Sequence, residues 1–278
     1  MEQNLADIIQ AWLPIAAAMI GTGVVAGILA GLLGVGGGIV IVPVFYFVLQ
    51  SIGVPQATAI LVATGTSLLV IIPTSLSSIR AHHQRGNIDW PLIKRWAPAM
   101  IIGVIAGSQT ALLVDGAWVS GLFGIIAILV AMNMLFRAKA APLAHQLPPM
   151  AGQRVMATCI GFFSVMIGIG GGTLGVPTLT SCNYPSHRAV GTAAVFGLLI
   201  SIPGAITMLL AHTPATAPDG MVGLVNIPGA LAIMPLTILL APFGAWIGSK
   251  LDAVLLKKLF AVFLCISGGR MLMQLLGA

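Results

Sequence analysis

Charged residues are scarce in this chain: they make up 6% of its 278 residues, whereas 58% are hydrophobic. Soluble domains carry about 25% charged residues. So few charges cannot cover a water-facing surface on a chain of this length. The sequence therefore predicts that most of the molecular surface faces lipid. No stretch is polar enough to form a separate soluble domain.

Acidic residues are rarer still, and none lies in the middle of an apolar segment; they are Glu2, Asp7, Asp89, Asp115, Asp219 and Asp252. A carboxylate inside the membrane is the usual proton relay or cation ligand, so its absence argues against a cation as substrate. The sequence contains no HExxH, GxSxG or paired intramembrane aspartates, and we do not expect an enzyme. Its three cysteines match no metal or disulfide pattern, so neither a metal nor a cofactor is expected.

The apolar residues fall into ten segments. In chain order these are 12–33, 39–49, 57–79, 96–114 and 118–136, followed by 155–167, 173–181, 189–211, 225–247 and 253–276. A membrane-spanning helix needs about 20 residues, so the second segment in each group of five is too short to cross. The pattern predicts an all-α polytopic membrane protein.

Two stretches of the sequence resemble each other. Residues 34–43 read GVGGGIVIVP and residues 168–177 read GIGGGTLGVP. The chain therefore forms one membrane transport domain, 1–278, built from two repeats at about 1–143 and 144–278. The alignment between the triplets stays open; the candidate pairs are Pro55 with Pro185, Pro73 with Pro203, and Gly65-Thr66 with Gly191-Thr192.

Basic residues cluster in three loops, at 80–95, 137–154 and 250–258. Loops rich in Lys and Arg stay in the cytoplasm, so we place these loops inside and both termini outside. The first repeat then starts outside and the second inside, which makes the repeats inverted. The short segments predict re-entrant or broken helices at the two glycine-rich turns. We expect a multi-pass protein of the bacterial plasma (inner) membrane, and no cleaved signal peptide because residues 1–10 lack a basic region.

Glycine-rich backbone at membrane depth is tolerated only where it is buried in protein or lines a wet cavity. A helix that begins after such a turn presents free N–H groups to an anion. We therefore predict substrate contacts at both triplets and at the residues expected to open the next helices: Gly36, Gly37, Gly38 and Ile39, and Gly170, Gly171, Gly172 and Thr173. The alternative is close helix packing through small residues. We prefer packing for the scattered glycines Gly103, Gly107, Gly244 and Gly248.

Polar side chains within the apolar segments are further candidates for substrate binding. They are Thr66, Ser67, Thr192 and Gln109. The hydroxyls could instead bond the preceding turn of their own helix. Gln109 is costlier to bury and is expected to face a cavity or a partner helix. Candidates for a charged rim or gate are His82, His83, His187 and Arg188, for which the alternatives are solvated surface groups or a topological charge.

The paired GVGGG and GIGGG motifs, each followed by proline, resemble the TauE/SafE sulfite exporter family, also called the sulfonate uptake permease family. The threonine-bearing segments 63–67 and 189–192 and the loop 82–90 resemble it too, and the match runs from about residue 26 to residue 276. This resemblance implies movement of small sulfur-containing anions such as sulfite, thiosulfate, sulfoacetate or other organosulfonates, more often outward than inward. One departure is Thr192-Ala193, where the first repeat has Thr66-Ser67.

The resulting hypothesis is a secondary transporter that works by alternating access around the two glycine turns. The alternatives are an anion channel of the same fold and a transporter of a different small organic anion. A structural or regulatory membrane protein would not need duplicated turns. The expected partners are a small anionic substrate and membrane lipid, with a homodimer left open. The formal charge of +6 reflects loop placement, and no nucleic acid is expected.

Overall fold

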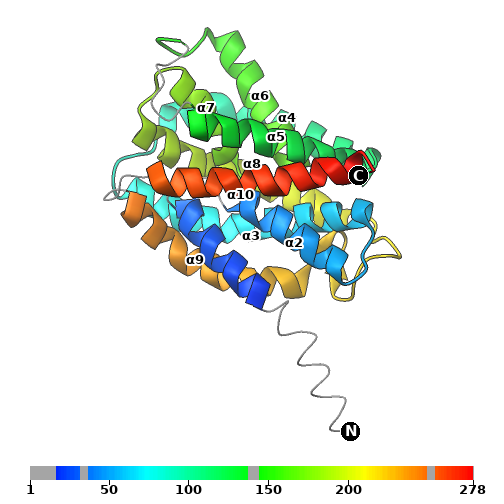
Figure 1. Ribbon diagram of the computed structural model, residues 1–278. Helices are drawn as coiled ribbons and strands as arrows, with labels where there is room; N and C mark the ends of the chain where they lie inside the picture. The colour runs from blue at the N-terminus through cyan, green and yellow to red at the C-terminus, as the bar shows by residue number, and fades with distance from the viewer. Residues whose placement is uncertain (1–16, 32–36, 137–143, 249–253, 278) are drawn as a thin grey trace.

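The computed structural model describes residues 17–31, 37–136, 144–248 and 254–277, and these form a bundle of helices (Figure 1). The first half contains the N-terminal helix Ala17–Gly31, α2 (Gly38–Ser51), α3 (Gln56–His83), α4 (Trp90–Leu113) and α5 (Gly116–Phe136). The second half contains α6 (Met150–Met166), α7 (Gly171–Ser181), α8 (Ser186–Leu210), α9 (Ile227–Gly248) and α10 (Val254–Leu275). A short antiparallel hairpin, β1 (Met221–Val222) and β2 (Val225–Asn226), precedes α9. The prediction of an all-α protein with five helical segments in each half is confirmed.

Five helices within the described residues are long and apolar enough to cross a membrane: α3, α4, α5, α8 and the part Ile227–Gly244 of α9. Large apolar side chains project from their outer faces; Ile102 on α4 is 65% exposed and Leu239 on α9 is 71% exposed. Helices satisfy their own backbone hydrogen bonds, so a helical bundle with an apolar surface suits lipid. The protein is therefore a multi-pass membrane protein.

Several helices extend further into the basic loops than the apolar segments predicted. Helix α3 continues to His83, so His82 and His83, which were expected in a loop, lie in its last turn. Helix α4 begins at Trp90 because the Asp89 side chain accepts a hydrogen bond from the backbone N–H of Leu92 and caps the helix. Hydropathy misses such ends because a helix can carry polar residues beyond the hydrocarbon core.

The two short helices also begin earlier than predicted. Helix α2 starts at Gly38 instead of Ile39, and α7 starts at Gly171 instead of Thr173. Gly37 takes the N-cap position of α2 in the left-handed region, with φ +78°. Gly37 lacks a Cβ and adopts this conformation at little cost, so the helix begins within the triplet.

The second glycine turn joins two helices that fold back on each other. After α7, the carbonyl of Ser181 accepts a hydrogen bond of 3.1 Å from the backbone N–H of Ala144, which lies just before α6. The α6–α7 pair therefore starts and ends at the same end of the bundle. In the first half, a methyl group at Gly37 would lie 2.9 Å from the carbonyl oxygen of Ala26, so the start of α2 packs against the N-terminal helix.

Three of the four scattered glycines pack closely against other helices, as predicted. A methyl group at Gly103 would collide with the carbonyl oxygen of Thr158, and one at Gly107 with that of Phe162, so α4 and α6 touch backbone to backbone. Gly244 meets the carbonyl of Ile28 in the same way, which brings α9 against the N-terminal helix (Figure 1). The surroundings of Gly248 lie outside the described residues.

Thr66 and Thr192 occupy matching positions in the two halves. Thr66 Oγ1 accepts a hydrogen bond of 2.9 Å from the backbone N–H of Asn226, just before α9. Thr192 Oγ1 accepts one of 3.0 Å from the backbone N–H of Asp89, just before α4. The preceding residues, Gly65 and Gly191, pack on backbone carbonyls two positions before Asn226 and Asp89. These contacts favour the pairing of Gly65-Thr66 with Gly191-Thr192.

Pro55 and Pro185 also match, because each is the N-cap residue of its helix, α3 or α8. The spacing from proline to threonine is longer in α3 than in α8 by about one helical turn. The helix starts therefore favour the proline pairing and the threonine contacts favour the pairing of Thr66 with Thr192, while the pairing of Pro73 with Pro203 stays a prediction.

Candidate functional site

The two glycine turns meet in the interior. A methyl group at Gly38, the first residue of α2, would lie 2.6 Å from the carbonyl oxygen of Gly168 and 3.0 Å from the Cα of Ile169. Gly168 lies between α6 and α7 and has a φ of +67°, which favours glycine. Two segments far apart in the sequence thus form one centre, which places the N-terminus of α2 against the turn that leads into α7.

Helix α3 supports this centre through Ser67. Its hydroxyl is fully buried and donates a hydrogen bond of 2.8 Å to the carbonyl oxygen of Gly168. A methyl group at Gly168 would lie 2.7 Å from the Cα of Thr64, one turn earlier on the same helix. The structure therefore brings Ser67 to the glycine turns, where it fixes the orientation of the Gly168 peptide.

Donor groups converge around the second turn. The first N–H groups of α7 have no acceptor within the helix, because a helix leaves its initial amides unpaired. Three buried hydroxyls near the turn have no hydrogen-bond partner among the described residues: those of Thr64, Ser164 and Thr173. An unpaired buried hydroxyl costs about 1–3 kcal/mol, so a concentration of them indicates a place for a ligand.

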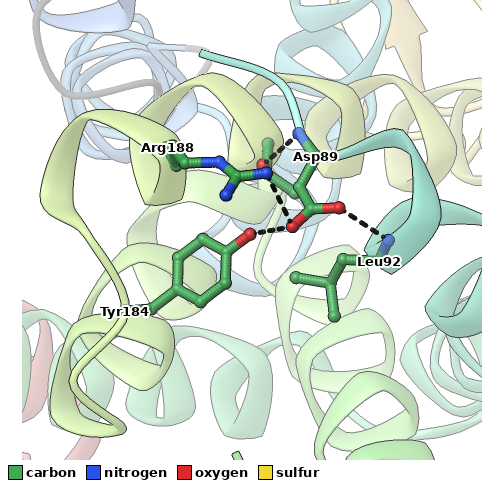
Figure 2. Close-up of polar contacts among 5 residues, drawn as sticks. Asp89, Leu92, Tyr184 and Arg188 are labelled. Carbon is green, nitrogen blue, oxygen red and sulfur yellow. Dashed lines mark hydrogen bonds and ion pairs between the residues drawn. The ribbon is translucent and has the colours of Figure 1, made fainter.

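A second cluster of polar side chains links the start of α4 to the start of α8 (Figure 2). The Asp89 carboxylate accepts a hydrogen bond from the hydroxyl of Tyr184 and pairs with Arg188 at 3.1 Å. Burial alone would raise the pKa of Asp89, but hydrogen bonds from Tyr184 and Leu92 and the charge of Arg188 hold it below its ordinary value. Asp89 is therefore charged at neutral pH.

Tyr184 completes this cluster as a hydrogen-bond donor. Burial, and then the hydrogen bond to the Asp89 carboxylate, raise the pKa of Tyr184 well above its ordinary value. The phenol therefore stays protonated. Sequence reasoning missed this residue, although a signal was present: it is one of only two tyrosines and directly precedes Pro185, the N-cap of α8.

The remaining predicted residues have separate surroundings. Arg188 is half exposed beside Asp89, and His187 is exposed. His83 is exposed against the ring of Trp90, whereas His82 is only 5% exposed. Gln109 is exposed on α4, on the face away from α6, and does not join the glycine turns. Thr66 and Thr192 hold the starts of α9 and α4, as described above.

Comparison with known proteins agrees with the fold. The family model described as Sulfite exporter TauE/SafE matches residues 19–271. A probable membrane transporter protein of Haemophilus influenzae is 30% identical over 245 residues, which cover 88% of this chain and 93% of the relative. One of Methanocaldococcus jannaschii is 30% identical, covering 90% and 93%, and one of Bacillus subtilis is 32% identical, covering 85% and 87%.

No solved structure matches the chain significantly. The family match covers most of the sequence, and the relatives align over nearly their whole length, so the resemblance seen in the glycine motifs is confirmed. All three relatives are named as probable membrane transporters. The chain is a membrane transporter that belongs to the TauE/SafE sulfite exporter family.

Proposed function

We propose that this protein is a secondary transporter that exports a small sulfur-containing anion such as sulfite, thiosulfate, sulfoacetate or another organosulfonate by alternating access. The observation that carries the proposal is the meeting of the two glycine turns, where the N-termini of α2 and α7 and three unpaired hydroxyls supply donors. An anion accepts hydrogen bonds from such groups. The restriction to sulfur anions is supported by the family name alone.

The donors at this centre are neutral, which suits transport. A sulfite or sulfonate group presents three oxygens that accept hydrogen bonds from amides and hydroxyls. A site without Lys or Arg binds an anion firmly enough to select it and weakly enough to release it. The anion would lie at the N-terminus of α7, with Thr173 and Ser164 beside it, and Gly37 and Gly170 would shape the two turns. The predicted contact at Gly36 lies outside the described residues.

Alternating access in this proposal depends on two inverted repeats. The matched threonine contacts and the matched helix pairs, α4 with α6 and α9 with the N-terminal helix, support such a symmetry. Helix α7 has 11 residues and extends about 16 Å, roughly half of the hydrocarbon core. The two hairpins would therefore re-enter the membrane and leave the site between them near the midplane.

Flux measurement tests the proposal. Purified protein in liposomes should take up sulfite or sulfoacetate with saturation and should show counterflow, in which internal unlabelled anion accelerates entry of labelled anion. A channel of the same fold would instead carry a large current and no counterflow. If a carboxylate shows saturable flux and every sulfur anion is transported more slowly, the substrate is a different organic anion.

The orientation yields a labelling prediction. Single cysteines placed in the linker 137–154 should resist a membrane-impermeant thiol reagent added outside intact cells, because basic loops remain in the cytoplasm. A cysteine at Asn4 should react, since both termini are expected outside. Reaction of the linker from outside would contradict the inverted arrangement, and permeabilised cells provide the control for reactivity.

The position of Arg188 yields a second prediction. Arg188→Gln should weaken the apparent affinity for the anion at the cytoplasmic face by at most about fivefold, because a half-exposed charge contributes about 0.2–1 kcal/mol. The matched control is Arg154→Gln, which removes an exposed cation in the first turns of α6. Equal affinities of both variants and the parent in inside-facing vesicles would count against a role in attracting the anion.

The Asp89 cluster predicts a pH-dependent stability. The pKa of Asp89 is lowered in the folded protein, so its stabilising contribution is present at neutral pH and is lost as pH falls through the lowered pKa, below about 4. Asp89→Asn should therefore melt about 2–4 °C lower than the parent at pH 7. The difference should shrink in acid; an unchanged difference at acid pH would mean that the carboxylate charge is not the cause.

A further inference from the structure

Helix α3 carries a line of buried polar side chains, Ser75, Ser78 and His82, which we call the α3 stripe. The three residues are 1%, 1% and 5% exposed, and their spacing places them on one face of the helix. In each of them a polar atom has no hydrogen-bond partner among the described residues: Oγ of Ser75, Oγ of Ser78 and Nδ1 of His82. Each residue of the stripe is therefore buried and has one polar atom without a hydrogen-bond partner among the described residues.

The adjacent face of the same helix is different. The hydroxyl of Thr74 donates to the carbonyl of Val70 at 2.8 Å and contacts Thr237 on α9 at 2.7 Å. The hydroxyl of Ser77 donates to the carbonyl of Ile238 at 2.9 Å. A hydroxyl in a helix usually finds such a carbonyl, so the unpaired atoms of the stripe are specific to its face. Unpaired polar groups inside a membrane protein mark a route for a substrate or ion.

The stripe leads to the glycine turns. A methyl group at Gly197 of α8 would lie 2.6 Å from Oγ of Ser75. The backbone nitrogen of Gly197 would in turn lie 3.0 Å from a methyl group at Gly171, the first residue of α7. In space, only Gly197 separates Ser75 from the N-terminus of α7, where the anion is expected.

The other end of the stripe lies at the basic end of the bundle. Nε2 of His82 is 3.3 Å from the carbonyl oxygen of Gly31, the last residue of the N-terminal helix. Arg80 follows Ser78 within the same two turns, and Arg85 follows soon after α3 ends. The positive-inside rule assigns this end to the cytoplasm. The stripe therefore joins the cytoplasmic end to the glycine centre.

The chemistry of the stripe suits a small oxyanion. The hydroxyls of Ser75 and Ser78 can each donate a hydrogen bond to an anion oxygen. A carbonyl oxygen only accepts, so Nε2 of His82 is the donor of its hydrogen bond to Gly31, and Nδ1 of the neutral ring then has a free lone pair. Nδ1 can accept a hydrogen bond from water, or from the acidic proton of an anion such as hydrogen sulfite. Several weak sites in series let an anion move from one to the next.

We propose that the α3 stripe lines the route by which the anion passes between the cytoplasm and the glycine turns. The proposal rests on the proposed function, because it takes the turns as the binding centre. In the structure α8 covers the stripe at Gly197, and the N-terminal helix covers it at Gly31. Movement of either cover relative to α3 opens the route.

Cysteine accessibility tests the route directly. Single cysteines, Ser75→Cys and Ser78→Cys, are introduced into the full chain after its own cysteines are replaced by alanine. An anionic methanethiosulfonate, itself a sulfonate, is added at the cytoplasmic face of inside-out vesicles. Both cysteines should react about tenfold faster than the control Thr74→Cys, which is equally buried on the same helix but lies on the paired face.

A lack of reaction at both stripe positions, or equal rates at the stripe and at the control, overturns the route. The labelling rates do not depend on transport of sulfur anions. They therefore test the route even if the protein transports a different anion. Parent protein that transports sulfite while the stripe cysteines stay unreactive refutes the route alone. Ser78→Ala provides a second test that needs no labelling: it should reduce sulfite flux about tenfold while sulfite binding at the turns, measured by calorimetry, is retained. Unchanged flux would also overturn the proposal.

Discussion

Alanine at Gly37 or Gly171 is expected to abolish most anion binding. At Gly37 the new methyl group would lie 2.9 Å from the carbonyl oxygen of Ala26. The alanine backbone would also have to keep a φ of +78°, which costs about 1 kcal/mol or more. At Gly171 the methyl group would press on Phe196 and on the Gly197 backbone and would displace the start of α7, whose first amides are proposed to bind the anion. Each change should weaken binding at least about tenfold, measured by calorimetry on folded, detergent-purified protein.

The chain contains matched controls for both changes. Gly53 also has a positive φ, +88°, but nothing lies within 4 Å of a methyl group there, so Gly53→Ala isolates the backbone strain. Gly21 lies in the N-terminal helix with open space around it, so Gly21→Ala isolates an added methyl group without strain. Both controls should bind like the parent. If folded Gly37→Ala and Gly171→Ala variants also bind like the parent, the glycine turns are packing devices and the site assignment is wrong.

Gly103 and Gly107 are not suitable controls for these changes. Each already touches a backbone carbonyl of α6, and a methyl group there would force the two helices apart. The sequence indicated correctly that these glycines are packing residues. It could not indicate how tight the contact is, because the partner helix is distant in the sequence and its register is set by the fold.

The order of helices was predictable because hydropathy reports the length of each apolar segment directly. The late end of α3 at His83 and the early start of α2 at Gly38 show where that signal stops. Helix boundaries depend on caps such as Asp89 and Gly37, which hydropathy does not detect. Gln109 illustrates a second limit. A polar residue in an apolar segment suggested a cavity, but its direction depends on which face of α4 packs against α6.

The residues of the candidate site were likewise predictable from the sequence only in part. The glycine triplets were visible as a repeated pattern, but the packing of Gly38 against Gly168 becomes apparent only once the fold is known. Thr66 and Thr192 were predicted to bind substrate, whereas the structure gives each hydroxyl oxygen a backbone N–H partner at the start of another helix. Their role in binding remains a prediction. Tyr184 and Asp89 are far apart in the sequence, so no local pattern could pair them.

Thr173→Val should make the protein more stable and, at the same time, a weaker binder. Valine has nearly the same shape as threonine, and the change removes a hydroxyl that is 3% exposed and has no hydrogen-bond partner among the described residues. Loss of this unpaired group should raise the free energy of unfolding by about 1 kcal/mol. If the hydroxyl donates to the bound anion, its loss costs about 1.5–3 kcal/mol of binding, or roughly 10- to 150-fold in Kd.

The opposite signs separate the two roles of this hydroxyl. A residue that only supports the fold would lose stability and binding together, whereas a ligand group left unsatisfied in the empty site loses binding alone. Thr178→Val on the same helix is the matched control, because its hydroxyl donates to the carbonyl of Leu174 at 2.6 Å. Thr178→Val should leave anion affinity unchanged. A Thr173→Val variant that melts higher and binds sulfite as tightly as the parent would place the anion elsewhere than at the N-terminus of α7.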